Sequence, residues 1–273
     1  MDDRVSPAFV TVGPVRLRCE CRGDGEPILF ISGLGNGWRC WEQQLVALGD
    51  QFRCLSYDPR DVGDSDLAPS PYSTRDLASD AVGVLDALGV GQAHVVGWSM
   101  GGAVAQEVAI GWPERVKRLA LIATYADGDE RGAANLRGWA LLRQRLTRAE
   151  YLRVTAPWVY SPSEYEQPML VQGIVEVALS GPEQPQAAFE RQVEATVLHH
   201  AGDRLDRVNA PTLLVFGADD ALTPLRFAHM LRQGIPHSEL IVLDGAGHAL
   251  LQTRAAEVNQ ALERFLKGGT RGP

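Results

Sequence analysis

A serine, an aspartate and a histidine occur along the chain in local contexts that could support nucleophilic catalysis. The segment Gly97-Trp98-Ser99-Met100-Gly101 matches G-x-S-x-G, a pattern in which a serine occupies a sharp turn between two glycines. A serine hydroxyl is a poor nucleophile unless a base removes its proton, so the chain must also supply a histidine. The chemistry indicated by this pattern is attack on a carbonyl carbon with transfer of an acyl group.

The residues around Ser99 predict a strand before it and a helix after it. Residues 93–97 form a short apolar run, and residues 100–110 have helical spacing. The flanking glycines leave room for a strained strand-to-helix turn. Such a turn places Ser99 at a helix N-terminus, where free N–H groups and the helix dipole favour developing negative charge. The alternative is that Ser99 only caps this helix.

His248 is the predicted base. It ends the segment Asp244-Gly245-Ala246-Gly247-His248, between an apolar strand at 239–243 and a final helix at 255–266. This position is at the carboxyl edge of a sheet, where the sites of α/β proteins assemble. The five other histidines are expected to be structural or solvated: His94, His199, His200, His229 and His237.

The acid that orients the base is predicted at the end of another strand. Residues 211–216 are apolar and lead into Asp219 and Asp220, and the spacing does not choose between these two. Asp244 is more consistent with a strand end. A carboxylate is required because it fixes the tautomer of the histidine and stabilises the imidazolium.

Two backbone N–H groups are needed to hold the negatively charged oxygen of a tetrahedral intermediate. One is predicted at Met100, directly after the nucleophile. The other is predicted at Leu34, in the loop Ser32-Gly33-Leu34-Gly35-Asn36-Gly37 that follows an apolar strand at 27–31. The alternative for this loop is a plain glycine turn.

Strands that alternate with helices must position these residues. The remaining strands are predicted at 15–21, 53–57 and 118–123, and helices at 41–48, 74–88 and 225–232. This alternation predicts an α/β fold with a mostly parallel sheet flanked by helices. Apolar strands are missing between residues 125 and 209, where helical patterns are divided by prolines at 157, 162, 168, 182 and 185. We therefore expect a core of residues 1–124 and 210–273, covered by a helical lid insertion at 125–209.

With these motifs the chain resembles the α/β-hydrolase superfamily. Ser32-Gly33-Leu34-Gly35 resembles its His-Gly oxyanion loop, with serine in place of histidine, and the residue after that glycine supports Leu34 as donor. Residues 58–65 resemble its Asp-x-Arg-Gly-x-Gly-x-Ser turn, with Asp61 in place of the first glycine. Relatives place the acid three residues after the glycine that corresponds to Gly217, which selects Asp220, although some carry it at the position of Asp127.

The resemblance implies a catalytic triad of Ser99, Asp220 and His248. Within the superfamily the chain is most similar to small esterases and lactonases, such as 3-oxoadipate enol-lactonases and polyketide methyl esterases. The expected reaction is hydrolysis of an ester or lactone of a small, apolar molecule through an acyl-enzyme. A lyase or cyclase, a perhydrolase, and a binding protein with little turnover remain open alternatives.

The insertion and the loops supply candidate substrate contacts. Trp38, Trp98, Trp139 and Trp158 could line an apolar or aromatic pocket, although tryptophan is also common in ordinary packing. Six arginines of the insertion could bind a carboxylate or could simply be solvated: Arg131, Arg137, Arg143, Arg145, Arg148 and Arg153.

Composition limits the partners. The net charge of -8 and the pI near 5.3 give no cationic footprint for nucleic acid. No run approaches the length of a membrane span, and residues 1–7 lack the apolar core of a signal peptide, so a cytoplasmic location is expected. The cysteines at 19, 21, 40 and 54 are expected to be reduced packing residues. We expect a small-molecule substrate and no metal or cofactor, and the oligomeric state stays open.

Overall fold

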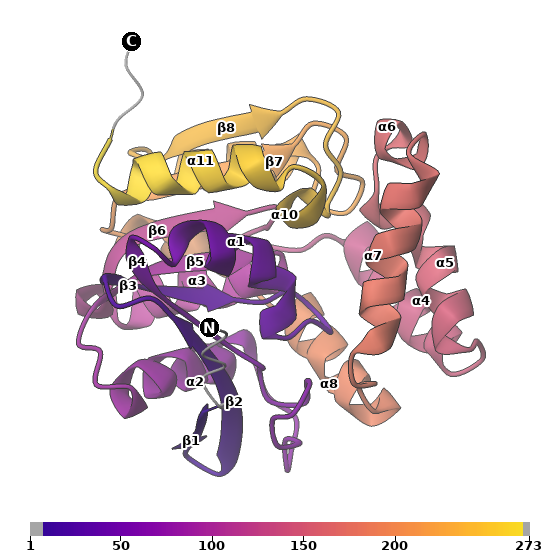
Figure 1. Ribbon diagram of the computed structural model, residues 1–273, viewed down its shortest axis with the longest axis horizontal. Coiled ribbons are helices and arrows are strands. Elements are labelled where there is room, and N and C mark those ends of the chain that lie inside the picture. The colour runs from indigo at the N-terminus through magenta and orange to yellow at the C-terminus, as the bar shows by residue number, and fades with distance from the viewer. Residues whose placement is uncertain (1–7, 270–273) are drawn as a thin grey trace.

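The apolar segments of the chain pair into one mixed sheet. The computed structural model describes residues 8–269, and within them eight strands are joined in the order β1-β2-β4-β3-β5-β6-β7-β8 (Figure 1). Only β2 runs antiparallel to its neighbours β1 and β4, and every other pair in this part of the chain is parallel. The strands are β1 Ala8–Val12, β2 Val15–Arg22, β3 Glu26–Ile31, β4 Phe52–Tyr57, β5 Ala93–Trp98, β6 Val116–Ile122, β7 Thr212–Gly217 and β8 Glu239–Leu243.

Strand β1 is the one strand that the sequence patterns did not predict. It lies at the edge of the sheet, and only Val10 of its five residues is buried. The inner strands β5 and β7 are buried at every residue, as expected for parallel strands that helices cover on both faces.

Helices cover both faces of the sheet and form two apolar cores with it. Helices α2 (Thr74–Ala87), α3 (Met100–Gly111) and α9 (Leu225–Gly234) pack on one face. Helices α1 (Glu42–Leu48), α10 (Leu250–Thr253) and α11 (Ala255–Leu266) pack on the other. These layers confirm the predicted fold class, a mostly parallel sheet flanked by helices.

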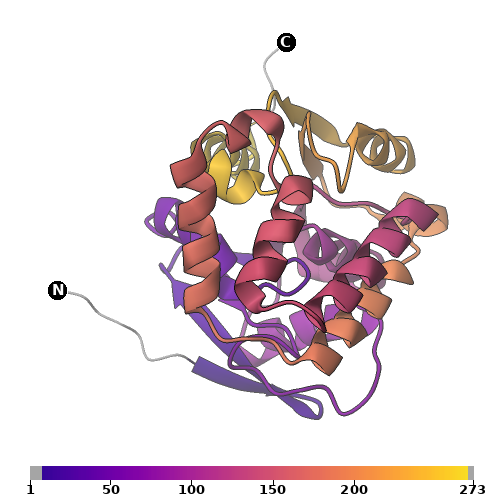
Figure 2. The ribbon, with the colours of Figure 1, turned by 90° about the vertical axis from the view of Figure 1, so that its right-hand side faces the viewer.

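Five α-helices lie in the chain between β6 and β7, and we call them the cap helices. They gather beside the sheet at the right of Figure 1, and the turned view of Figure 2 shows them in front of it. Their bounds are α4 Glu130–Arg143, α5 Arg148–Val159, α6 Pro162–Tyr165, α7 Pro168–Ser180 and α8 Gln186–Val197.

The prolines of this region act mostly as predicted. Pro162 and Pro168 begin helices, and Pro182 and Pro185 lie between α7 and α8. The expectation that Pro157 divides two helices is wrong, because it lies inside α5. Pro157 has no N–H to donate to the Arg153 carbonyl, so α5 lacks one intrahelical hydrogen bond close to its end.

Within residues 8–269, no helix is long and apolar enough to cross a membrane. The expectation about a signal peptide concerns residues 1–7, which lie outside the described residues.

The turn between β5 and α3 depends on two glycines. Ser99 has φ 57° and ψ −123°, and a positive φ is uncommon for a residue with a side chain. A Cβ atom at Gly97 would overlap the carbonyl oxygen of Gly101, and one at Gly101 would overlap the carbonyl oxygen of Ile31. The helix can therefore start directly against the ends of β3 and β5 only because side chains are absent here.

We expect Gly101→Ala to lower the free energy of unfolding by about 1–3 kcal/mol, because the added methyl must displace the end of β3. The matched control is Gly111→Ala, at the other end of α3, where a Cβ atom meets nothing within 4 Å. That variant should be neutral or more stable by up to about 1 kcal/mol, since alanine is the better helix former. Urea unfolding measures both, and equal effects of the two substitutions would contradict this account.

Candidate active site

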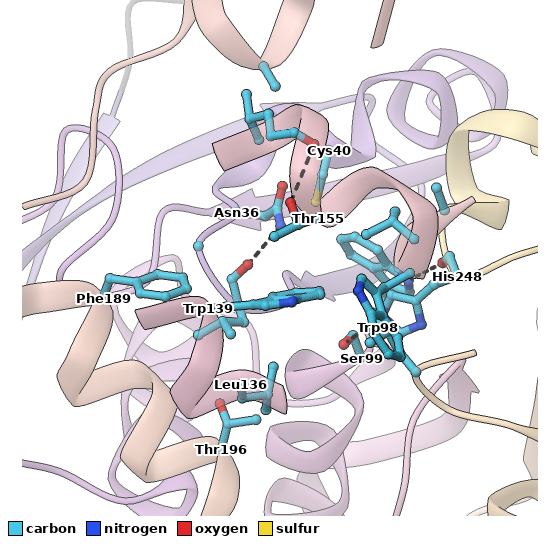
Figure 3. A pocket seen from close by; sticks show the side chains of 18 of the residues that line it. Asn36, Cys40, Trp98, Ser99, Leu136, Trp139, Thr155, Phe189, Thr196 and His248 are labelled. Carbon is cyan, nitrogen blue, oxygen red and sulfur yellow. Dashed lines mark hydrogen bonds between the residues drawn. The ribbon is translucent and has the colours of Figure 1, made fainter. Parts of the chain in front are cut away.

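Ser99 and His248 meet at the carboxyl edge of the sheet. Ser99 follows β5 and His248 follows β8, and the distance from His248 Nε2 to Ser99 Oγ is 2.9 Å. Figure 3 shows the two side chains together beside Trp98. Two hydrogen bonds hold the backbone of Ser99 at the end of β6. The Ser99 N–H donates to the Ile122 carbonyl, and the Thr124 hydroxyl donates to the Ser99 carbonyl at 2.7 Å.

Asp220 lies on the far side of the histidine ring. Its Oδ2 is 2.8 Å from His248 Nδ1 and accepts a hydrogen bond of 2.6 Å from the Thr223 hydroxyl. Its Oδ1 accepts the backbone N–H groups of Leu222 and Thr223. Asp219, by contrast, is exposed, whereas Asp220 is buried. Of the two neighbouring aspartates, the structure thus brings Asp220 to the histidine.

Competing effects act on the Asp220 carboxyl. Burial by itself would raise its pKa, because the charged form loses solvation. The His248 ring and the hydrogen bonds from Thr223 outweigh burial, and the net effect lowers the pKa below its usual value. The ionised Asp220 needs a donor at His248 Nδ1, so we assign the proton to Nδ1. Nε2 is then the acceptor for the Ser99 hydroxyl.

The other candidate bases and acids have partners away from Ser99. His199 contacts the Thr74 hydroxyl at 2.9 Å, and its burial lowers its pKa to about 4. Asp127 accepts the N–H groups of Ala201 and Gly202 and lies 2.8 Å from His200. His94 is buried near the start of β5. None of these groups joins the Ser99–His248–Asp220 cluster.

The loop after β3 lies against Ser99. A Cβ atom at Gly33 would come within 3.2 Å of Ser99 Cβ, so the loop passes directly beside the serine. Across residues 8–269, neither the Leu34 nor the Met100 backbone N–H donates a hydrogen bond to another protein group. Both donors are therefore available to a ligand. Ser32, in the place of the usual histidine, donates its hydroxyl to the Gly37 carbonyl within the same loop.

Asp58 joins this loop to the turn that follows β4. Its carboxylate accepts the N–H groups of Trp38 and Asp64, and it is buried. Burial raises the Asp58 pKa, although the two N–H donors oppose that rise. The turn at residues 58–65 therefore holds the neighbouring loop in place at the edge of the cavity described below.

The backbone of His248 is held from both sides. Its N–H donates to the Val159 carbonyl at the end of α5, at 2.8 Å. Its carbonyl accepts the Trp98 indole N–H at 3.1 Å, and the Trp98 side chain is nearly buried. The loop that carries His248 is thus held both by Trp98, next to Ser99, and by a cap helix.

Asp61 shows why one position departs from the glycine pattern. Asp61 keeps a positive φ of 71°, which glycine adopts easily, but it also has a buried carboxylate that accepts hydrogen bonds. The carboxylate oxygens accept two hydrogen bonds from Arg191 on α8, at 2.7 and 2.9 Å, and a third from the Ala68 N–H. The side chain that glycine lacks thus attaches a cap helix to the core.

A cavity of about 650 Å³ opens between the cap helices and the sheet edge, and Ser99 and His248 line it. Trp38, Trp98, Trp139 and Trp158 line the same cavity. In the view of Figure 3 the Trp139 ring lies between Phe189 and the Trp98–Ser99 pair. The four tryptophans named from the sequence thus all border one cavity, and whether they contact a substrate stays a prediction.

The six arginines of the insertion divide into two groups. Arg131, Arg143 and Arg148 line the cavity, whereas Arg137, Arg145 and Arg153 do not. Arg143 and Arg148 donate to backbone carbonyls, and Arg137 pairs with Glu194. These contacts stabilise the packing of the cap helices.

The four cysteines are free, and one of them, Cys40, lines the cavity. Burial raises the pKa of the Cys40 thiol to about 12, so it is not an alternative nucleophile at neutral pH. Among the described residues, no cluster of three or more histidine, cysteine or acidic side chains could hold a metal ion.

Sequence patterns missed several residues that support the site. Thr223 could have been found, because Asp-x-x-Thr is a common turn in which the aspartate accepts the following N–H groups. Thr124, Val159 and Gln192 carry no local signal, since they reach the site only through tertiary packing.

Comparison with known proteins identifies the family. A model described as "Alpha/beta hydrolase family" matches residues 28–261. A putative carbamate hydrolase RutD of Azorhizobium caulinodans is 30% identical over 257 residues, which cover 93% of this chain and 96% of that protein. The 3-oxoadipate enol-lactonase 2 of Acinetobacter baylyi is 29% identical and covers 90% of each chain.

Solved structures agree with this relationship. A thermophilic esterase from Thermogutta terrifontis superposes with a TM-score of 0.85 at 26% identity, over 96% of this chain and 98% of the esterase. The predicted resemblance, including the similarity to enol-lactonases, is confirmed. The sheet order, the elbow at Ser99 and these matches together show that the chain belongs to the α/β-hydrolase family.

Proposed function

We propose that this protein is a carboxylic-ester hydrolase that cleaves a small ester or lactone through an acyl-enzyme. The observation that carries the proposal is the continuous hydrogen-bonded chain from Ser99 Oγ through His248 to Asp220, with distances of 2.9 and 2.8 Å. This arrangement suits a serine nucleophile, a general base and an orienting acid.

The reaction has two steps. His248 Nε2 takes the hydroxyl proton while Ser99 Oγ attacks the carbonyl carbon, and the Leu34 and Met100 N–H groups hold the oxyanion. His248 then gives the proton to the leaving alkoxide, which leaves an ester on Ser99. Water attacks this ester with His248 again as base, releasing the acid and restoring the serine. Asp220 stabilises the imidazolium in both steps.

The substrate is small and largely apolar. The cavity beside Ser99 is lined by four tryptophans and by aliphatic residues of the cap helices, and charged side chains such as Arg131 and Asp129 also border it. Residues 125–209 serve as the lid over a core of residues 1–124 and 210–273. Relatives named as an enol-lactonase, an esterase and a carbamate hydrolase favour a panel of lactones, esters and carbamates as first substrates.

We expect Ser99→Ala to lower the rate of p-nitrophenyl acetate hydrolysis by more than about 10³-fold, because no other group can form the acyl-enzyme. Ser238→Ala, at a buried serine that bonds only the Ile235 carbonyl, is the control and should keep the wild-type rate. The release of p-nitrophenol measures both variants. Comparable turnover by Ser99→Ala would refute the assignment of the nucleophile.

Three further measurements separate the alternatives. Hydrolysis must place one oxygen atom from isotopically labelled water in the acid product, whereas a lyase or cyclase forms its product without that uptake. A perhydrolase would prefer hydrogen peroxide to water as the second nucleophile. Stoichiometric labelling of Ser99 without sustained turnover would favour a binding protein.

We expect Asp220→Asn to lower kcat by about 10³- to 10⁴-fold, because the amide cannot fix the required tautomer of His248. Asp219→Asn is the matched control at the adjacent, exposed position, and its kcat should stay within about twofold of wild type. Steady-state kinetics on the best ester of the panel tests the pair. The reverse ranking would move the acid to Asp219.

A further inference from the structure

The loop that carries Leu34 is attached to a cap helix through one buried glutamine. The Gly35 N–H donates to Gln192 Oε1 at 2.9 Å, and Gln192, on α8, is fully buried. Gly35 has φ +70°, so the chain turns sharply at the point of this contact. The two residues are 157 positions apart and are joined only by tertiary packing.

Gln192 is held in place by its own neighbours. Gln184 Nε2 donates to the same Gln192 oxygen at 3.0 Å, and Arg143 donates to the Gln184 carbonyl at 2.6 Å. The Gln192 Nε2 has no hydrogen-bond partner among the described residues. A buried amide nitrogen without a partner costs about 1–3 kcal/mol, so the orientation of this side chain is set by what its oxygen binds.

The bond fixes one particular peptide plane. The Gly35 N–H belongs to the peptide that joins Leu34 to Gly35, and the carbonyl oxygen of that peptide accepts Asn36 Nδ2 at 2.9 Å. The plane is therefore held at both ends. Leu34 is left with little freedom of rotation, and this sets the direction of its own N–H, which lies one peptide earlier.

We propose that Gln192 is a positioning residue for the oxyanion hole, which aims the Leu34 N–H by anchoring the Leu34–Gly35 peptide to α8. The inference rests on the proposed function, in which Leu34 is a donor to the oxyanion. Its consequence is that the oxyanion hole is complete only while α8 is seated on the loop. The cap then contributes to the chemical step as well as to substrate fit.

The test is Gln192→Met, which keeps the length of the side chain and removes its acceptor. We expect kcat for the best ester to fall about 10- to 100-fold while KM changes less than about threefold, because the oxyanion exists only in the transition state. The affinity for a trifluoromethyl ketone of matching shape, which forms a tetrahedral adduct with Ser99, should fall by a similar factor. Gln192→Glu keeps an acceptor oxygen and should retain most of the wild-type kcat and most of the affinity for the ketone.

Gln186→Met is the matched control. Gln186 lies on the same helix, and its Nε2 donates to the Ala140 carbonyl at 2.9 Å, inside the cap and away from the Leu34 loop. It should affect the unfolding midpoint but not the ketone affinity. If Gln192→Met does not fold, Gln192→Asn, which is one methylene shorter and withdraws the oxygen from Gly35, carries the same expectation.

Three outcomes would overturn the inference and leave the proposed function standing. Wild-type kcat and ketone affinity in a folded Gln192→Met protein would contradict it, as would an equal loss in Gln186→Met. A loss that appears in KM alone would assign Gln192 to substrate binding. Failure of the wild-type protein to turn over any ester would instead contradict the proposed function itself, and with it this inference.

Discussion

The strained backbone of Ser99 is the constraint on which the other parts of the site depend. A residue with a side chain at φ 57° costs about 1–3 kcal/mol, and the surrounding structure must hold it there. Bonds from both sides of the serine to the end of β6 do so, and the glycines at 97 and 101 let α3 start against two strands. Once Ser99 Oγ is fixed in this way, His248, Asp220 and the loop that carries Leu34 must all be positioned relative to it.

Each of those groups comes from the end of a different strand. The Leu34 loop follows β3, Asp220 follows β7 and His248 follows β8, so the parallel sheet sets the distances between them. Longer-range bonds then adjust the loops: Asp58 joins two of them, and Trp98 joins the nucleophile turn to the histidine. The sheet provides coarse placement, and a small set of buried polar contacts provides the fine placement.

Sequence patterns predicted the parts of this arrangement that have local signals. The glycines around Ser99, the loop before His248 and the apolar central strands can be recognised within a few residues of themselves, and their elements lie within about two residues of the predicted bounds. Spacing could not separate Asp219 from Asp220, because both follow the same strand and only the turn to Thr223 distinguishes them. Strand β1 was missed because a short edge strand with one buried residue has little apolar pattern. The contacts of Gln192 and Val159 join segments far apart in the chain, which no local pattern records.

The Val159 carbonyl accepts the His248 N–H, and this contact limits which cap segments can replace the present one. Cap segments in this fold are natural targets for exchange, since they begin and end at neighbouring strands β6 and β7. Here a grafted cap must bring a carbonyl to the histidine loop and an arginine to Asp61 in addition to a new pocket lining. Selection for a different pocket is thus tied to preservation of these two contacts, and the exchangeable unit is the cap together with its points of attachment.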